Sequence, residues 1–260
     1  MQQSDRMLLI ELTEQLKAVA SAVTEVRESQ RGIERRLDAI EAGVERGRKA
    51  VEGAARTGYA QVEDLLALYR SIDTTEPLPR MRAFAAGPEL MRFLFEEVAA
   101  TGGARVLECG SGTSTVVLAY AMRSLGNGHV TALEHHAHYA EQTRRELAAR
   151  GLSEWATVVE APLKDVDLGG ETWRWYDTAA VPEGTVDLLL VDGPPGNTGP
   201  HARYPAMPVL APKLAEQALV VLDDADRPDE RAIVARWVAE FPGFAKKRLK
   251  HERGTVLLRR

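Results

Sequence analysis

Residues 106–115 read VLECGSGTST, a short apolar run that carries Glu108 and ends in a turn with Gly110 and Gly112. Glycine lets the backbone come close to a ligand, and the helix expected to follow points its free N–H groups at the same place. Ligands of open α/β sheets bind where such strands end. The stretch therefore predicts a ligand-binding turn at the end of a buried strand, although a G-x-G turn alone is weak evidence.

Two residues of this turn argue against a dinucleotide as the ligand. A dinucleotide-binding turn has a third small residue, and Thr115 stands at that position. Glu108 comes two residues before the first glycine and would lie beside a pyrophosphate of the same charge. Glu108 suits a positively charged ligand instead.

The composition excludes several classes of protein. The chain has 260 residues, a formal net charge of −5 and a hydrophobic fraction of 45%, so it can bury a sizeable core but has no overall basic field for nucleic acid. Its single cysteine, Cys109, cannot form an intrachain disulfide and suits a reducing compartment. The first residues lack the features of a signal peptide, and no apolar run approaches the ~18 residues of a membrane span. We expect a cytoplasmic protein with no membrane span and no nucleic-acid partner.

An uninterrupted heptad pattern runs through residues 9–51. Its seam residues, most of them apolar, recur at alternating steps of three and four, which is the ~3.5-residue period of a left-handed coiled coil. We therefore expect homo-oligomerisation through residues 9–51, with an undetermined number of chains. A lone amphipathic helix that folds back onto the rest of the chain is the alternative. The seam consists of Leu9, Leu12, Leu16, Val19, Val23, Val26, Gln30, Ile33, Leu37, Ile40, Val44, Gly47 and Val51.

The chain divides by pattern into three parts: a coiled-coil helix (1–55), a helical linker and N-terminal extension (56–100), and an α/β domain (101–260). In the last part short apolar runs alternate with helical patterns, which predicts a doubly wound sheet with parallel central strands. The last two strands are too close in sequence for a crossover helix and should pair antiparallel. The expected strands are 104–109, 129–134, 156–160, 186–192, 218–224, 245–250 and 254–259, and the expected helices of this part are 114–124, 137–150, 203–215 and 228–240.

Carboxylates end the second and third expected strands. Glu134, about twenty residues after the glycines, could accept both hydroxyls of a ribose. Glu160 stands near where the edge of an adenine would lie, and a simple surface carboxylate is the alternative for this residue.

Three aspartates end the fourth and fifth expected strands. Asp192 precedes a stiff GPPG turn, and Asp223 and Asp224 end the next strand. Because neighbouring strand ends meet at one edge of the sheet, these acids could bind Mg²⁺ or a similar hard cation. The alternative is that Asp223 and Asp224 cap the following helix and pair with Arg227 or Arg231.

The order ECGSGTST, ALE, LLLVDGPPG and VVLDD, followed by the closing hairpin, resembles the class I S-adenosylmethionine-dependent methyltransferases over residues 80–260. The resemblance implies a seven-stranded sheet of order 3-2-1-4-5-7-6 with strand 7 antiparallel. In such a site Glu108 and the glycine turn would hold the methionine part of the cofactor and Glu134 the ribose. Asp192 would lie beside the sulfonium and the acceptor. The residues implied to bind the cofactor are Glu108, Gly110, Ser111, Gly112, Ser114, Glu134, His135, Glu160, Ala161 and Asp192.

Two groups within this superfamily show further likeness. Asp192 with the Asp223-Asp224 pair is similar to the metal-binding acids of the catechol-type O-methyltransferases, in which the cation holds the acceptor oxygens. The longer, proline-rich loop after Asp192 looks more like bacterial methyltransferases that modify sugars or natural products. The resemblance therefore implies methylation of a hydroxyl on a small-molecule or carbohydrate acceptor, with a divalent cation held by the three aspartates.

Asp192 and His201 are the candidate catalytic residues. His201 lies on the loop after Asp192 and could accept the proton of the hydroxyl, with His135 and His136 as alternatives. Two other functions stay open: a nicotinamide-dependent oxidoreductase, and a non-catalytic coiled-coil scaffold with a cofactor-sensing domain. Three aromatic residues before the fourth strand form either a wall for the acceptor or core packing: Trp173, Trp175 and Tyr176.

Overall fold

The computed structural model describes residues 3–74, 76–81, 85–181 and 183–260. Contacts divide the chain into two compact units, Met1–Gly58 and Tyr59–Arg260. The boundary lies close to the expected end of the coiled-coil part at residue 55. The segment expected as a linker belongs to the second unit from Tyr59 onward. Among the described residues, no helix combines the length and the apolar character that a membrane crossing requires.

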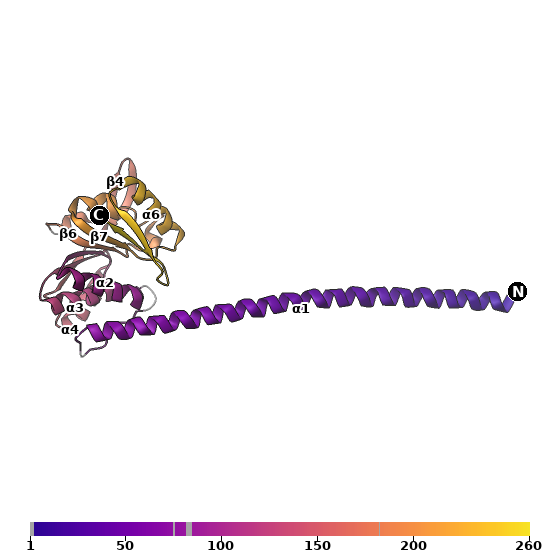
Figure 1. Cartoon of the computed structure of the whole chain (residues 1–260). Coiled ribbons are helices and arrows are strands. Elements are labelled where there is room, and N and C mark those ends of the chain that lie inside the picture. The colour runs from indigo at the N-terminus through magenta and orange to yellow at the C-terminus, as the bar shows by residue number, and fades with distance from the viewer. Residues whose placement is uncertain (1–2, 75, 82–84, 182) are drawn as a thin grey trace. The chain divides into compact units, whose positions relative to one another are not determined.

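A single helix, α1 (Gln3–Ser71), contains all described residues of the first unit (Figure 1). The apolar seam residues between Leu9 and Val51 are all exposed in the single chain, by 45% to 70%. A long helix with an exposed apolar seam is typical of a single helix taken from a coiled coil. Self-association stays a prediction.

The second unit is built on a seven-stranded sheet. Its order is β3-β2-β1-β6-β7-β9-β8, and β9 runs antiparallel to both of its neighbours while the other pairs are parallel. Counted in chain order without the β4–β5 hairpin, this is the predicted order 3-2-1-4-5-7-6. The strands are β1 (Arg105–Cys109), β2 (His129–Glu134), β3 (Ala156–Glu160), β6 (Val186–Val191), β7 (Leu214–Leu222), β8 (Ala245–Leu249) and β9 (Thr255–Arg259).

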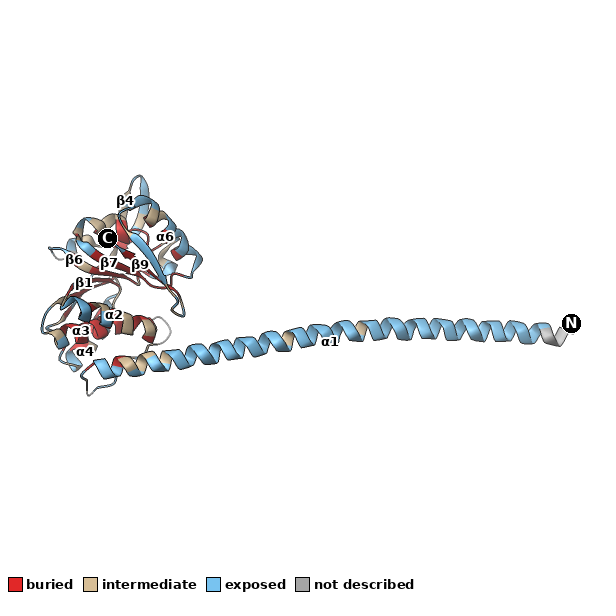
Figure 2. Cartoon of the chain, viewed as in Figure 1, coloured by how far each residue is buried: buried red, intermediate tan, exposed pale blue. Residues whose placement is uncertain are grey.

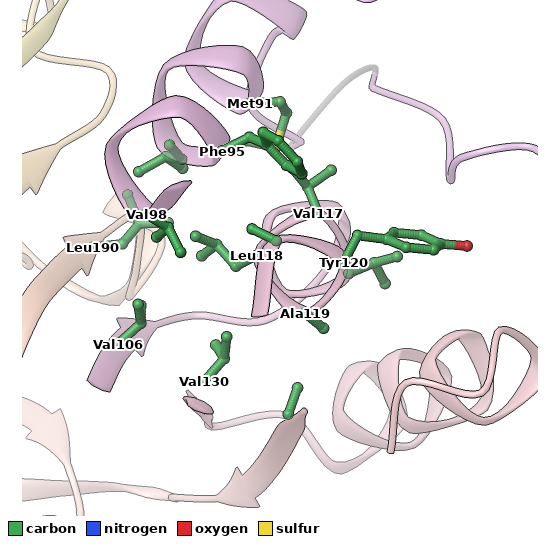
Figure 3. Packing of buried hydrophobic residues seen from close by; sticks show 14 of the residues in the cluster. Met91, Phe95, Val98, Val106, Val117, Leu118, Ala119, Tyr120, Val130 and Leu190 are labelled. Atoms are coloured by element: carbon green, nitrogen blue, oxygen red, sulfur yellow. The ribbon is translucent and has the colours of Figure 1, made fainter. Parts of the chain in front are cut away.

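Helices cover both faces of this sheet because its strands alternate their side chains between two apolar cores. One core joins the end of α1 to α2 (Pro88–Thr101), α3 (Thr113–Leu125) and α4 (Ala137–Ala149). Figure 3 shows Met91, Phe95 and Val98 of α2 directed toward α3 and the strands. The other core contains α5 (Ala206–Leu210), α6 (Pro228–Glu240) and the end of β5 (Glu171–Tyr176).

Two sequence predictions differ from the structure. The helix predicted over residues 203–215 is wrong: only α5 and a 3₁₀ turn, η3 (Ala211–Lys213), form there, and β7 begins at Leu214 rather than at residue 218. Prolines at positions 205, 208 and 212 remove the N–H groups that a longer helix requires.

The second difference is a hairpin that the sequence reading did not predict. Strand β4 (Leu163–Leu168) pairs antiparallel with β5, and together they form a separate two-stranded sheet. The turn between them is Gly169-Gly170, and both glycines have positive φ, at 66° and 89°. Such a glycine pair favours the tight turn of a hairpin. Two further 3₁₀ turns, η1 (Thr178–Ala180) and η2 (Gly196–Thr198), flank β6.

Candidate active site

The glycine turn after β1 is organised by a buried hydrogen-bond group. Glu108 is 1% exposed and accepts from the hydroxyls of Ser114 and Thr115, the latter at 2.7 Å. The backbone N–H of Gly112 donates to the hydroxyl of Thr115 at 3.0 Å. Thr115 therefore ties the turn to the carboxylate at the position where a dinucleotide-binding turn has a third small residue. Gly110, with φ of 107°, supplies the left-handed backbone that the turn requires.

Burial changes the chemistry of Glu108. Loss of hydration raises the pKa of its carboxyl to about 7, although hydrogen bonds from Ser114 and Thr115 oppose the shift. Both of its oxygens already accept hydrogen bonds within the chain. Glu108 thus stabilises the conformation of the turn through hydrogen bonds within the chain, a role that the sequence alone did not reveal.

Glu134, at the end of β2, lies beside this turn. It is 5% exposed, accepts from the hydroxyl of Ser111 at 3.1 Å and accepts from the backbone N–H of His136 at 3.0 Å. Burial alone would raise the pKa of Glu134, but His135, the His136 amide and Ser111 outweigh it and hold the pKa below its ordinary value. The structure therefore brings an ionised carboxylate to the glycine turn.

The remaining predicted cofactor residues differ in their surroundings. His135 is half-buried, and its ring meets the edge of the Tyr176 ring at a centroid distance of 6.1 Å. Ala161 is buried, and its N–H donates to the carbonyl of Glu134 at 2.8 Å. Glu160 is exposed and pairs with Arg144 at 2.8 Å.

Asp192, Asp223 and Asp224 come together at the ends of β6 and β7. One carboxylate oxygen from each lies within 4.8 Å of the others. Asp223 and Asp224 are almost fully buried, and Asp192 is partly buried. The predicted convergence of these three acids is confirmed.

Arg203 is the functional candidate that sequence reasoning missed. It is 3% exposed, and its Nη2 donates to Asp192 Oδ1 at 3.2 Å and to Asp224 Oδ2 at 3.1 Å. The same nitrogen donates to the backbone carbonyl of Asp192 at 2.6 Å, and Nη1 donates to the carbonyl of Asp223 at 2.9 Å. One guanidinium therefore connects both strand ends. No local pattern marks this arginine, because its partners are distant in sequence.

The acids outnumber this buried cation. Asp224 also pairs with the half-exposed Arg227 at 2.9 Å, which confirms the predicted alternative partner. Asp224 Oδ1 is buried and accepts no hydrogen bond from the described residues, with Arg253 lying 3.8 Å away. Burial raises the pKa of Asp223 to about 6, and Asp224 adds to the shift. Burial also raises the pKa of Asp192 well above its ordinary value, against the effect of Arg203.

Two non-glycine residues of this region have left-handed backbone. His201 has φ of 49° and Asp224 has φ of 56°. Such conformations cost about 1–3 kcal/mol each and cluster at functional sites. The N–H of His201 donates to Asp229 Oδ2 at 3.1 Å, and the residue is half-buried two positions before Arg203.

The aromatic residues of β5 pack rather than form an open wall. Trp175 is fully buried, and Trp173 stacks against Tyr204 at a centroid distance of 4.7 Å. Tyr176 is 1% exposed, and its hydroxyl has no hydrogen-bond partner among the described residues. That hydroxyl lies against Gly193, where an added Cβ would collide with it. Glycine at this position therefore allows the ends of β1, β5 and β6 to close together.

The sheet order, the glycine turn and the acids at the strand ends define a class I methyltransferase fold. Residues 107–225 match a family model described as a methyltransferase domain. The α/β unit therefore has the fold of the class I S-adenosylmethionine-dependent methyltransferases and matches the methyltransferase-domain model over these residues. The match favours methyl transfer over the nicotinamide-dependent alternative. No curated protein matches the sequence of the chain.

Solved structures with low sequence identity share this fold. The chain is similar to the SAH-bound methyltransferase PaMTH1 from Podospora anserina, with 14% identity, coverage of 82% of this chain and 95% of that chain, and a TM-score of 0.57. It is also similar to an SAH-bound O-methyltransferase from Bacillus cereus, with 16% identity, 76% and 89% coverage, and a TM-score of 0.52. A third is the SAM-bound O-methyltransferase TomG from Streptomyces achromogenes, involved in tomaymycin synthesis, with 17% identity, 68% and 81% coverage, and a TM-score of 0.50.

Proposed function

We propose that the chain transfers a methyl group from S-adenosylmethionine to a hydroxyl oxygen of a small-molecule or carbohydrate acceptor. The observation that carries the proposal is the ionised carboxylate of Glu134, buried beside the glycine turn at the end of β2. A carboxylate in this place can accept hydrogen bonds from both hydroxyls of a ribose. The O-methyltransferases among the structures of similar fold support oxygen as the methylated atom.

The cofactor fits the residues around the turn. Glu134 with His135 would bind the ribose, and the turn from Gly110 to Ser114, held in shape by Glu108, would bind the methionine part. Glu160 and Ala161 would lie at the adenine. When bound, the sulfonium supplies a methyl group for in-line displacement: the carbon–sulfur bond breaks with its electron pair going to sulfur as the oxygen–carbon bond forms. The protein contributes by orienting the two reactants and excluding water.

His201 is the proposed general base. The acceptor hydroxyl must lose its proton as its oxygen forms the new bond, and a positioned imidazole can take that proton. The left-handed backbone of His201 supports this assignment, because a conformation of that cost persists where the surrounding structure holds it. Asp192, on the same loop, would lie beside the reacting methyl group.

A divalent cation is the second element of the proposal. Asp192, Asp223 and Asp224 offer hard oxygen ligands, which Mg²⁺ prefers. Arg203 neutralises one charge of the cluster, and no donor among the described residues forms a hydrogen bond with the buried Asp224 Oδ1. When bound, such a cation would hold the acceptor oxygen and favour its deprotonated form. Arg203 would then share the acids with the cation and keep the two strand ends in place.

Self-association through residues 9–51 completes the proposal. The exposed apolar seam of α1 supports a coiled coil formed by copies of this chain.

Formation of S-adenosylhomocysteine in the presence of a panel of phenolic, sugar and polyketide hydroxyls tests the function. The proposal expects turnover with at least one acceptor that carries a free hydroxyl and none with its O-methylated counterpart. Cofactor binding without turnover on any member of a broad panel would favour the sensing scaffold instead.

A further inference from the structure

A second exposed apolar stripe lies at the C-terminal end of α1, on the unit Tyr59–Arg260. Its members are Tyr59, Val62, Leu66 and Tyr69, at successive steps of three, four and three residues. They are 68%, 53%, 60% and 37% exposed. Residues at these steps share one side of a helix, so they form a continuous apolar surface. We refer to these four residues as the basal stripe.

The other side of the same helix turns packs against the methyltransferase unit and fixes the orientation of the basal stripe. Leu68 and Ile72 are 1% and 5% exposed and belong to the core under the sheet. Asp64 pairs with Arg92 of α2 at 3.0 Å. Figure 2 shows buried and intermediate residues near this end of α1, whereas most of the helix before it is exposed. The stripe is therefore a fixed feature of the methyltransferase unit and is not free to turn inward.

The seam of residues 9–51 does not continue into this stripe with its own spacing. Continued steps of three and four after Val51 lead through the half-buried Leu65 to Leu68 and Ile72, which belong to the core of the chain itself. Two successive steps of four, from Val51 through Ala55 to Tyr59, lead to the basal stripe instead. Because the step from Gly47 to Val51 is also four, three steps of four follow one another, which equals two four-residue insertions and moves the seam by one residue. Such insertions are stutters, which locally unwind a coiled coil without interrupting its helices, and we refer to this double insertion as the stutter. The seam of residues 9–51 and the basal stripe thus form one series from Leu9 to Tyr69.

The stutter also selects the partner. Where the apolar seam of one helix shifts by one residue, the seam of its partner must shift at the same level along the coiled coil for the two to stay in contact. In a parallel pair of identical helices every residue faces its own copy, so the shift after Val51 is matched automatically. In an antiparallel pair the shift would face the regular spacing near Val23, and the two seams would lose contact. Monomeric proteins rarely leave such apolar surfaces uncovered.

We propose that a second copy of this chain covers the basal stripe, in a parallel and in-register pairing of α1 that extends through Tyr69. This inference rests on the proposed self-association through residues 9–51 and adds that the coiled coil reaches the methyltransferase unit. At ~1.5 Å per residue the paired helix is then on the order of 90 Å long. The methyltransferase units of the paired copies are consequently joined at their own surface.

Cysteine crosslinking of the full-length chain tests the pairing. The native Cys109 is fully buried, so an introduced thiol is the reactive one. Val62→Cys places a thiol on the basal stripe, Ile40→Cys places one on the upstream seam, and Ala60→Cys places one on an exposed position beside the stripe. Mild oxidation should convert most of the Val62→Cys and Ile40→Cys chains into covalent dimers, at least 10-fold faster than the Ala60→Cys chain.

The outcomes separate the two levels of the proposal. If the wild-type chain sediments as a monomer and Ile40→Cys fails to crosslink, self-association itself is wrong. If Ile40→Cys crosslinks but Val62→Cys is no faster than Ala60→Cys, the coiled coil exists and the basal pairing is wrong. An antiparallel assembly would also leave Val62→Cys unlinked. As a second measurement, Leu66→Glu should weaken self-association at least 10-fold by sedimentation, and an unchanged dissociation constant would contradict the inference.

Discussion

The hydroxyl of Thr115 donates to Glu108 at 2.7 Å, and both side chains are buried within the turn after β1. This contact explains a departure from the dinucleotide fingerprint, because the threonine at the third small position holds the carboxylate that precedes the glycines. Glu108 is also an acid whose protonation is coupled to folding, because burial raises the pKa of its carboxyl.

Glu108→Gln should change how stability depends on pH. The native carboxyl keeps its proton up to about pH 7, whereas the unfolded chain loses it near the ordinary pKa of 4.5. Between these values the unfolded state binds fewer protons, so the free energy of unfolding falls as pH rises, by about 3 kcal/mol in all. Glutamine removes this loss. Urea unfolding at about pH 5 and pH 8 should therefore show the variant gaining on the wild type as pH rises. A difference that stays constant across this range, as expected for the exposed control Glu154→Gln, would contradict the coupling.

Arg203→Met should destabilise the fold far more than Arg227→Met. Both arginines contact Asp224, but Arg203 is buried and also holds Asp192, whereas Arg227 is half-exposed. Removing one partner of a buried ion pair costs about 3–5 kcal/mol, and removing an exposed partner costs less than about 1 kcal/mol. The melting temperature should fall by about 10 °C for Arg203→Met and by a few degrees at most for Arg227→Met. Equal shifts of the melting temperature would mean that the contacts of Arg203 with the two strand ends do not stabilise the fold more than the surface pair of Arg227 does.

His201→Asn should reduce turnover without unfolding the protein. Asparagine tolerates the left-handed backbone of position 201 but cannot accept the proton of a hydroxyl at neutral pH. Loss of a general base lowers kcat by about 10²- to 10⁴-fold. The exposed His138→Asn serves as control. Full turnover by His201→Asn, measured as S-adenosylhomocysteine formation, would remove His201 from the mechanism.

Removal of divalent cations should lower activity if the acid cluster holds one. EDTA should reduce turnover and added Mg²⁺ or Mn²⁺ should restore it, while Asp223→Asn should abolish the response. The control is Asp226→Asn, an exposed acid that pairs with Arg248. Mg²⁺ should also raise the melting temperature of the wild type but not of Asp223→Asn, because a ligand that binds only the native state stabilises it. Unchanged turnover in EDTA would leave Arg203 as the counter-charge of these acids.

The sequence was most informative where chemistry follows local pattern. Apolar runs that alternate with helical patterns predicted five parallel strands, and the short spacer between the last two runs predicted the closing hairpin. The convergence of Asp192 with Asp223 and Asp224 followed from their places at strand ends. The β4–β5 hairpin was missed even though Gly169-Gly170 marks its turn, because the alternation around it is interrupted by charged residues. The prolines after Arg203 should have argued against the helix predicted there.

Other features had no local signal. Arg203 reaches Asp192 across the loop and Asp224 across the neighbouring strand end, and such contacts depend on how the sheet brings distant residues together. His and Asp adopt left-handed backbone more often than most residues, but tertiary packing decides that His201 and Asp224 do so here. The basal stripe was not predicted, because the regular heptad spacing can be continued past Val51. Only the burial of Leu68 and Ile72 shows that this continuation faces the core and that the exposed residues follow a different spacing.

Calorimetric titration with S-adenosylmethionine tests the central claim most directly. The wild-type chain should bind, and Glu134→Gln should raise the dissociation constant by about 10- to 100-fold, because hydrogen bonds to a charged group contribute about 1.5–3 kcal/mol. The exposed Glu154→Gln should bind as the wild type does. Absence of binding by the wild type, or equal affinity of the wild type and Glu134→Gln, would contradict the assignment of this turn and carboxylate to the cofactor.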